Sequence, residues 1–231
     1  MDKPSFISVI LARGGSKGIP NKNLSLVNRR PLIHWSISAS LDSKYISETY
    51  VSSDSKEILS YAKKSGASII TRPLNLAEDT TSSADSLEHA VNEIKKRFNP
   101  DYVILLQPTS PLRTTKHIDN ACSKIIKEKS NYLVSVCEIE KKYLKILIES
   151  SDGGLEDPTK GRYTFSDRQS LPKTFLPNGA IYIVKLKSFL KTKTFLGKTS
   201  SFYSMDENSS LDIDNVSDIK EANKRFASLD T

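Results

Sequence analysis

The stretch FISVILARGGSKGIPNKN, residues 6–23, joins a short apolar run to a glycine-rich, basic loop. Large and β-branched apolar side chains dominate residues 6–12, which predicts a buried strand. The loop holds Gly14, Gly15 and Gly18, whose backbones can turn tightly and approach a ligand closely. Its basic side chains are Arg13, Lys17 and Lys22. A cationic, glycine-rich loop at the end of a first strand favours the binding of a polyphosphate.

The spacing within this loop excludes two familiar phosphate-binding motifs. A P-loop needs lysine directly after its last glycine, but Gly18 is followed by Ile19 and Pro20. A dinucleotide fingerprint needs a glycine two positions before Gly15, where this chain has Arg13. An exposed basic turn is the alternative interpretation, so phosphate binding needs support from the rest of the chain.

Helix-like and strand-like patterns alternate from residue 31 to residue 139. Strands are expected at 46–53, 67–72, 101–108 and 132–139. Helices are expected at 31–41, 55–66, 82–98 and 117–129. This alternation predicts an α/β fold with a doubly wound, mostly parallel sheet. Ligands bind beyond the carboxyl ends of the strands in such sheets, so we expect the opening loop, Asp54, Arg72 and residues 107–113 at one edge.

The alternation stops near residue 140, and residues 140–178 are rich in charge and turn-forming residues. We expect this segment to leave the sheet as an arm or a small dimerisation lobe. The sheet is expected to resume at 179–185, a further strand to end at 210–214, and a closing helix to cover 215–229.

The composition suits a globular protein that acts on a small anion. The chain has 231 residues, 37% of them hydrophobic, and a formal net charge of +7. Basic residues are interleaved with acids along most of the chain, and no basic run carries interleaved aromatics. An anionic substrate therefore fits better than a nucleic acid partner.

The cysteines and the apolar segments indicate a cytoplasmic protein. Cys122 and Cys137 lack the spacing of a metal site or a redox motif, and both fall in apolar patterns typical of inert core cysteines. That usage is typical of a reducing compartment. The first apolar run is too short for a signal peptide, and no stretch approaches the length of a membrane span, so no membrane partner is expected.

Asp212 and Asp214 are candidate metal ligands. If residues 210–214 end a strand, the period of two directs both carboxylates to the same side. Two carboxylates on one face suit Mg²⁺, which completes its coordination with phosphate oxygens and water. An acidic pair on a solvated surface is the alternative interpretation. Gln107, directly after the most apolar strand, is a candidate substrate contact.

Six segments, in order, resemble the acylneuraminate cytidylyltransferases, also called CMP-sialic acid synthetases. They are ILARGGSKGIPNKNL (10–24), YVSSDSKEI (50–58), RPLNLAEDTTSS (72–83), LLQPTSPLR (105–113), PNGAIYI (177–183) and LDIDNVSDI (211–219). The resemblance extends from Ile7 to the last helix. Related enzymes that activate the eight-carbon sugar Kdo usually have an aromatic residue after the arginine, where this chain has Gly14-Gly15. The resemblance therefore favours nine-carbon acids.

The resemblance implies a role for each matching position. A catalytic role is implied for Arg13, Lys22, Asp212 and Asp214, the two aspartates being the magnesium ligands. Contacts with the nucleotide CTP are implied for Arg13, Lys17, Lys22, Asn23, Arg72, Thr81 and Ser83. Of these, Asn23 is expected near the ribose and Ser83 at the cytosine. Contacts with the sugar acid are implied for Gln107, Lys145, Arg168, Asn178 and Tyr182.

The resemblance also implies a fold, a reaction and an assembly. It implies one Rossmann-like cytidylyltransferase domain over residues 1–231, with 140–178 forming a dimerisation lobe through which a partner subunit contributes to the sugar site. The implied reaction transfers CMP from CTP to a nonulosonic acid. Leu176 stands where close relatives often have arginine, so sialic, legionaminic and pseudaminic acids remain open.

Several alternatives remain at this stage. A Kdo-type or other acid sugar is one, and a non-enzymatic protein that binds nucleotides or nucleic acid is another. His34, His89 and His117 fall in expected helices and match no motif, so a histidine base is not expected. A metal-bound hydroxide or an aspartate is the expected base, and the sequence does not choose between them.

Overall fold

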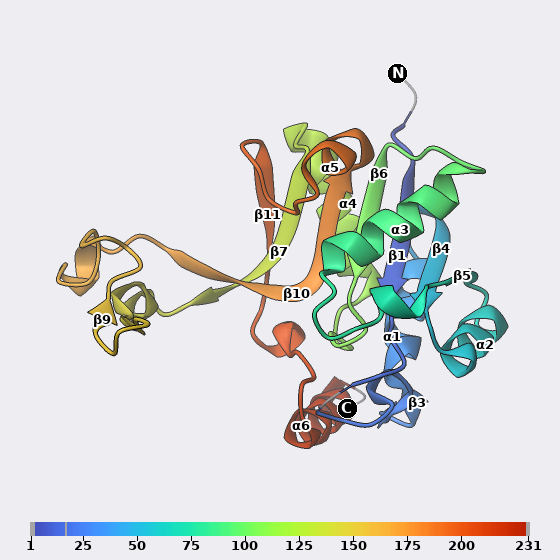
Figure 1. Cartoon of the computed structure of the whole chain (residues 1–231), viewed down its shortest axis with the longest axis horizontal. Helices are drawn as coiled ribbons and strands as arrows, with labels where there is room; N and C mark the ends of the chain where they lie inside the picture. Colours follow the sequence, from blue (N-terminus) through green and yellow to red (C-terminus); the bar gives the residue numbers. More distant parts are fainter. Residues whose placement is uncertain (1–2, 17, 230–231) are drawn as a thin grey trace.

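The computed structural model describes residues 3–16 and 18–229. Their centre is a seven-stranded sheet with the strand order β11-β7-β10-β6-β1-β4-β5 (Figure 1). In that order, the strands are β11 (Ser200–Met205), β7 (Tyr132–Ile139), β10 (Thr174–Lys185), β6 (Tyr102–Leu106), β1 (Phe6–Leu11), β4 (Ile46–Ser53) and β5 (Ser68–Thr71). Two short pairs lie apart from the sheet: β2 (Leu26–Val27) with β3 (Arg30–Pro31), and β8 (Ile148–Glu149) with β9 (Leu155–Glu156).

Helices cover both faces of the sheet, as the alternating pattern predicts. The helices are α1 (Leu32–Leu41), α2 (Lys56–Lys64), α3 (Ser83–Lys95), α4 (Thr115–Glu128), α5 (Leu186–Thr192) and α6 (Val216–Leu229). Apolar side chains of α1, α2 and α4 share one buried cluster with the sheet, and those of α3 and α5 share another. The doubly wound α/β fold is confirmed.

One strand runs against the others. β1 pairs in parallel with β4 and β6, and β7 pairs in parallel with β11. β10 is antiparallel to both of its neighbours, β6 and β7. The chain leaves the sheet at the end of β7 and returns directly beside it, so β10 comes back in the opposite direction. The sheet is therefore mostly parallel.

Residues 140–173 form an arm that projects from the sheet. β7 and β10 remain paired at its base, where Thr174 lies opposite Ile139. Figure 1 shows the arm reaching away from the sheet on the side opposite β5 and α2. Its exposed apolar side chains include Phe165, which is 92% exposed, together with Ile146, Leu147, Ile148 and Leu155.

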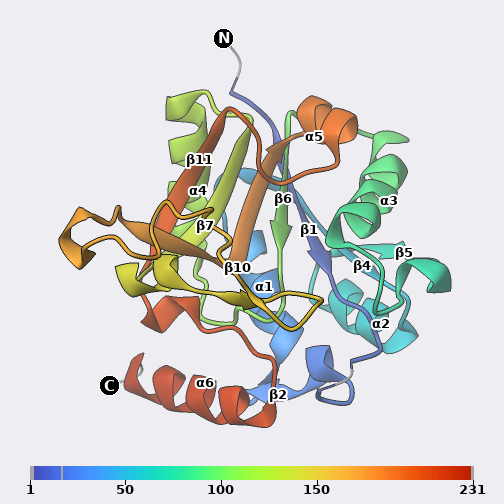
Figure 2. The ribbon, with the colours of Figure 1, turned by 60° about the vertical axis from the view of Figure 1, so that its left-hand side comes forward.

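The strand expected at residues 210–214 is wrong. β11 ends at Met205, a 3₁₀ turn covers Asn208–Ser210, and residues 211–214 form a loop. The backbone N–H of Ile213 donates to Thr109 O at 2.9 Å, in the loop after β6, instead of to a neighbouring strand. Ile213 itself is fully buried in a small cluster with α6, which runs beside β2 (Figure 2).

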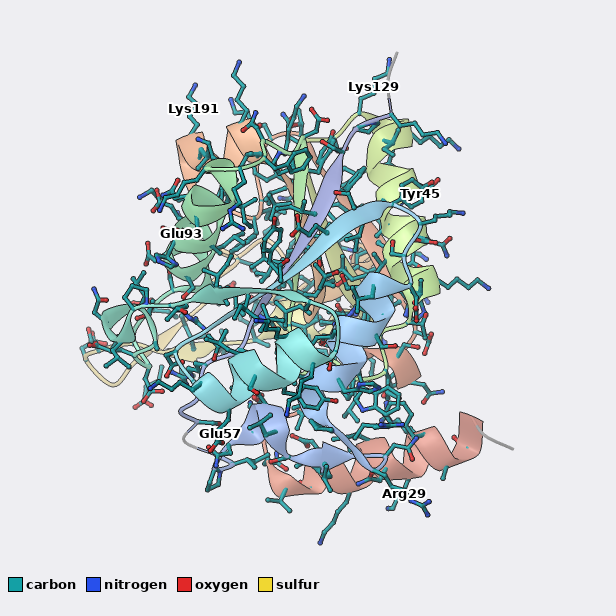
Figure 3. The ribbon with its side chains drawn as sticks, turned by 90° about the vertical axis from the view of Figure 1, so that its right-hand side faces the viewer. Arg29, Tyr45, Glu57, Glu93, Lys129 and Lys191 are labelled. Atoms are coloured by element: carbon teal, nitrogen blue, oxygen red, sulfur yellow. The ribbon has the colours of Figure 1, made fainter. Side chains whose placement is uncertain are left out.

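Positive charge is spread over the molecule. Lys129 and Lys191 project from the end opposite Arg29 (Figure 3). Among the residues that the structure describes, no helix is long and apolar enough to cross a membrane.

Candidate functional site

A cavity of about 350 Å³ opens where β1, β5 and β6 end. Leu11, at the end of β1, and Leu105, near the end of β6, line this cavity. Arg72, which directly follows β5, lines it as well. Most of the predicted site residues line it: Arg13, Lys22, Asn23, Arg72, Thr81, Ser83, Gln107, Asp212 and Asp214. Lys17 lies outside the described residues. The prediction that these loops meet at one edge of the sheet is confirmed.

The glycine-rich loop is held by its neighbours. Gly14 N donates to the Asp54 carboxylate at 2.9 Å. A Cβ on Gly18 would come within 2.7 Å of Asp214 O, so glycine lets the loop approach that backbone. The Asn23 side chain donates to Arg13 O at 2.9 Å, so its amide fixes the loop's path. The loop is thus tied to β4 on one side and to the aspartate loop on the other.

Arg13 faces an acidic partner across the cavity. Its guanidinium lies 2.6 Å from the Asp79 carboxylate, and both side chains are partly exposed. Asp79 belongs to the segment between β5 and α3, which Thr81 braces by donating from its hydroxyl to Asn75 O. The acidic residues Glu78 and Asp79 also line the cavity, and sequence reasoning gave them no role.

Arg72 is a buried cation at the cavity wall. It is 5% exposed and donates to Ser86 Oγ and to Ser52 O, while its Nε has no hydrogen-bond partner among the described residues. Burial lowers the pKa of Arg72, an effect that nearby Asp54 opposes and Arg13 reinforces. A guanidinium in this state suits an anion that enters the cavity.

Ser83 is the first residue of α3 and lies beside the helix cap. The preceding Ser82 is the cap, because its hydroxyl accepts from Asp85 N at 3.1 Å. Ser83 therefore lines the cavity without serving as the cap.

Asp212 and Asp214 flank the buried Ile213 and both line the cavity. Both carboxylates reach one cavity, although the strand geometry expected for them is wrong. Lys22 Nζ donates to Ile213 O at 2.9 Å and to Asp214 Oδ1 at 3.2 Å. Asp212 is substantially exposed to solvent, yet surrounding protein raises its pKa. A hydrogen bond from Thr109 opposes that rise, and the charge of Asp214 adds to it.

The acidic pair fits a divalent cation that is shared with a ligand. Among the described residues, no group of three or more His, Cys, Asp and Glu side chains gathers as a metal site. The protein therefore offers Asp212 and Asp214, and phosphate oxygens and water would complete the coordination. The histidines lie on α1, α3 and α4 and do not line the cavity.

Two predicted sugar contacts on β10 do not line the cavity. The Asn178 amide is already engaged: its oxygen accepts from Ser135 Oγ at 2.6 Å, and its nitrogen donates to Ser210 Oγ at 2.9 Å. Tyr182 packs against Phe195, with 5.3 Å between ring centroids. Burial raises the pKa of Tyr182, and the negative charge of Asp212 adds to the effect, which indicates that the phenol lies near the aspartate.

The other two predicted sugar contacts lie on the arm. Arg168 is 3.6 Å from Glu140, and both side chains are largely exposed. Lys145 lies in the 3₁₀ turn Lys141–Lys145 at the start of the arm. Within this chain, the structure does not bring Lys145 or Arg168 to the cavity.

Comparison with known proteins identifies similar sequences. The family described as Cytidylyltransferase matches residues 7–150. The chain is 36% identical over 224 residues to the N-acylneuraminate cytidylyltransferase of Escherichia coli O18:K1:H7, covering 94% of this chain but 51% of that protein. It is 31% identical over 218 residues to the CMP-N,N'-diacetyllegionaminic acid synthase of Campylobacter jejuni, covering 93% and 92% of the two chains. The chain thus spans about half the length of the first of these relatives.

Solved structures show the same fold. A structure of CMP:2-keto-3-deoxy-manno-octonic acid synthetase in complex with CTP superimposes with a TM-score of 0.74. The match covers 97% of this chain and 99% of that one, at 13% sequence identity. At this identity, the likeness concerns the fold alone.

Proposed function

The chain belongs to the cytidylyltransferase family, and from that premise we propose that it transfers CMP from CTP to the anomeric hydroxyl of a nonulosonic acid, releasing pyrophosphate. The convergence of Arg13, Lys22 and Arg72 with Asp212 and Asp214 on one cavity carries the proposal. The relative from Campylobacter jejuni, which matches over nearly its whole length and is named for CMP-linked legionaminic acid, supports the sugar class.

The cavity's cations address the main physical difficulty of this reaction, which is concentrated negative charge. A triphosphate must approach a sugar that carries a carboxylate. Arg13 and Arg72 would bind phosphate oxygens, and Lys22 would bind the charge that develops on the leaving pyrophosphate. We propose that Lys17, which lies between Arg13 and Lys22 in the sequence, also binds phosphate oxygens.

Cytidylyltransferases of this kind generally use a divalent metal. We propose that the metal is Mg²⁺ and that Asp212 and Asp214 hold it. When bound, the cation would withdraw negative charge from the phosphate oxygens. Lys22 already contacts Asp214, so this lysine lies where it can also reach a phosphate bound beside the aspartates.

The arm suits a second copy of the chain. Its exposed apolar side chains include Phe165, Leu155 and Ile148, whose burial would stabilise a homodimer. We propose that Lys145 and Arg168 complete the sugar site in the partner's cavity, because they do not reach the cavity of their own chain. Cys122 and Cys137 are both free, which is consistent with a cytoplasmic location.

Pyrophosphate release tests the proposal. The purified protein would receive CTP, Mg²⁺ and, in separate reactions, sialic, legionaminic, pseudaminic and Kdo-type acids. We expect release with at least one nine-carbon acid and little with UTP, because a cavity matched to cytosine leaves polar groups unpaired around uracil, typically at about 1–3 kcal/mol each. Release with the Kdo-type acid alone would reassign the sugar. CTP binding without turnover on any acid would favour a non-enzymatic nucleotide-binding protein.

A further inference from the structure

Arg113 is a fully buried arginine beneath the cavity. It is 2% exposed, and no carboxylate among the described residues forms an ion pair with it. Its Nη1 donates to Gln107 O at 3.0 Å and to Ala180 O at 3.2 Å. Its Nη2 donates to Ser36 Oγ at 2.5 Å, and that hydroxyl in turn donates to Gln107 O. The guanidinium thus joins β6, β10 and α1 through neutral acceptors.

The two carbonyls that share Nη1 lie where a strand ladder ends. β6 and β10 pair from Tyr102 opposite Lys185 to Leu105 opposite Tyr182. Continuing this register would place Gln107 opposite Ala180, but the ladder does not extend that far. Instead, both carbonyls accept from Arg113. The guanidinium takes the place of the missing ladder bonds and lies between the end of β6 and the middle of β10.

The separation of the two strands leaves room for the Gln107 side chain beside Gly179. Gly179, next to Ala180, has φ +74° and no side chain, and a Cβ there would lie 2.6 Å from Gln107 Oε1. The Gln107 amide therefore rests against the bare backbone of Gly179. Gln107 also lines the cavity, whereas Arg113 does not. The backbone carbonyl of Gln107 accepts hydrogen bonds from Arg113 and Ser36.

Stability alone does not explain a charge at this position. Burial lowers the pKa of Arg113 to about 9, so the side chain remains charged at neutral pH. A buried charge costs desolvation free energy, and well-packed apolar residues often replace such groups without loss of stability. An apolar side chain, however, would offer no donor to the carbonyls of Gln107 and Ala180.

We propose that Arg113 is a positioning residue: it holds the end of β6 apart from the middle of β10 and so directs the Gln107 amide toward the sugar acid. The hydrogen bonds from Arg113 and Ser36 fix the backbone carbonyl of Gln107, and the close approach to Gly179 fixes the place of its amide. That the Gln107 amide contacts a sugar acid rests on the proposed function.

A double-mutant cycle between Arg113 and Gln107 tests this inference. Gln107→Ala and Arg113→Met should each raise the KM for the sugar acid about tenfold, the usual effect of one lost hydrogen bond, with the KM for CTP changed less than about twofold. Because both variants remove the same contact, the double variant should resemble Gln107→Ala alone. Arg113→Lys, which retains one charged donor, should recover part of the loss.

Two controls separate positioning from general destabilisation. Ile125→Ala removes a fully buried side chain of α4 and should lower the melting temperature without changing the KM for the sugar acid. Additive effects of the Arg113 and Gln107 variants would overturn the inference. So would equal changes in the KM for CTP and for the sugar acid. If Arg113→Met fails to fold, the same comparison with Arg113→Lys decides.

An NMR measurement keeps the inference independent of the assigned reaction. The side-chain amide signal of Gln107, identified by its loss in Gln107→Ala, should shift in Arg113→Lys and not in Ile125→Ala. An unmoved signal would overturn the positioning role. If the unmodified protein releases no pyrophosphate with any acid, the proposed function fails, and the amide signal still decides the role of Arg113.

Discussion

At the scale of single residues, Arg72 and Arg113 show why residue type alone does not identify a binding residue. Both are buried, and neither has a carboxylate partner within ion-pair distance among the described residues. The Nε of each has no hydrogen-bond partner among the described residues, but only Arg72 lines the cavity, where an anion could bind to it. Arg113 spends its donors mainly on two backbone carbonyls and lies outside the cavity lining. The difference lies in the acceptors that the fold provides.

The first prediction concerns Asp212 and Asp214, the two proposed metal ligands. Asp212→Asn should lower kcat by about 10²–10³-fold, since one electrostatic contact is lost from a preorganised site. Partial recovery at raised Mg²⁺ concentration is expected if weakened metal binding is the main defect. Pyrophosphate release at limiting and saturating Mg²⁺ measures both effects. Full activity of Asp212→Asn and of Asp214→Asn at limiting Mg²⁺ would contradict the metal assignment.

The same variant has a stability signature that depends on pH. Because protein atoms around Asp212 raise its pKa in the folded state, folding favours the protonated form. The contribution of the Asp212 carboxyl group to the free energy of unfolding is fully present below its unfolded-state pKa of 3.8. This contribution is lost as the pH rises through the higher pKa of the folded state. Asp212→Asn should therefore melt at the same temperature as the unmodified protein, or higher, at pH 7, and should lose that advantage at pH 3. Thermal unfolding at both pH values checks the sign.

A third prediction concerns the ion pair between Arg13 and Asp79. Incoming phosphates must compete with the Asp79 carboxylate for Arg13. Both side chains are partly exposed, so the pair contributes at most about 1 kcal/mol. Asp79→Asn should therefore tighten the binding of metal-free CTP by up to about fivefold. Calorimetric titration measures this change, with Asp42→Asn as the control, because Asp42 is exposed at the end of α1 and does not line the cavity. Unchanged or weaker CTP binding would give Asp79 a different role.

At the scale of secondary-structure elements, local patterns predicted most of the sheet but not its one reversed strand. β4 has the predicted bounds, and α2 and α3 begin within one residue of the predicted helix starts, because these signals lie within a few neighbouring residues. The direction of β10 depends on the path of the arm, which no local pattern records. The strand expected at 210–214 fails because Ile213 bonds to the distant Thr109. For the same reason, the partners of Asp79 and Arg113 could not be found from the sequence.

The positive φ of Gly179, within β10, supports a prediction. Gly179→Ala adds a Cβ against Gln107 Oε1 at a residue with φ +74°. We expect a loss of about 1 kcal/mol from backbone strain and a raised KM for the sugar acid. Gly66→Ala is the matched control, because Gly66 also has a positive φ, +92°, and the added Cβ would meet only a Leu41 side-chain carbon at 3.6 Å. Both variants should be less stable, and only Gly179→Ala should alter sugar use. An unchanged KM in Gly179→Ala would show that Gln107 tolerates the displacement.

At the scale of the whole molecule, the cavity and the arm are separate parts of one chain. The cavity gathers the cationic side chains Arg13, Lys22 and Arg72 and two carboxylates at the end of the sheet. The arm carries Lys145 and Arg168 away from it and exposes a set of apolar side chains. The sequence predicted that residues 140–178 leave the sheet, because the alternation of strands and helices stops there, but β10 already begins at Thr174. Which cavity the arm serves depends on assembly, which a single sequence does not encode in any local pattern.

Mixing two inactive variants tests whether the arm of one subunit completes the cavity of another. Arg168→Ala damages the arm, and Asp212→Asn damages the cavity. In a mixed dimer, the intact cavity of the first subunit would meet the intact arm of the second, which restores one of the two sites. Random exchange of equal amounts produces mixed dimers in half of the population, so about one quarter of the unmodified activity should return. Sedimentation of a Phe165→Asp variant, which should dissociate, checks that the arm forms the interface. Failure of the mixture to recover activity, with subunit exchange confirmed, would mean that each arm serves its own cavity or none.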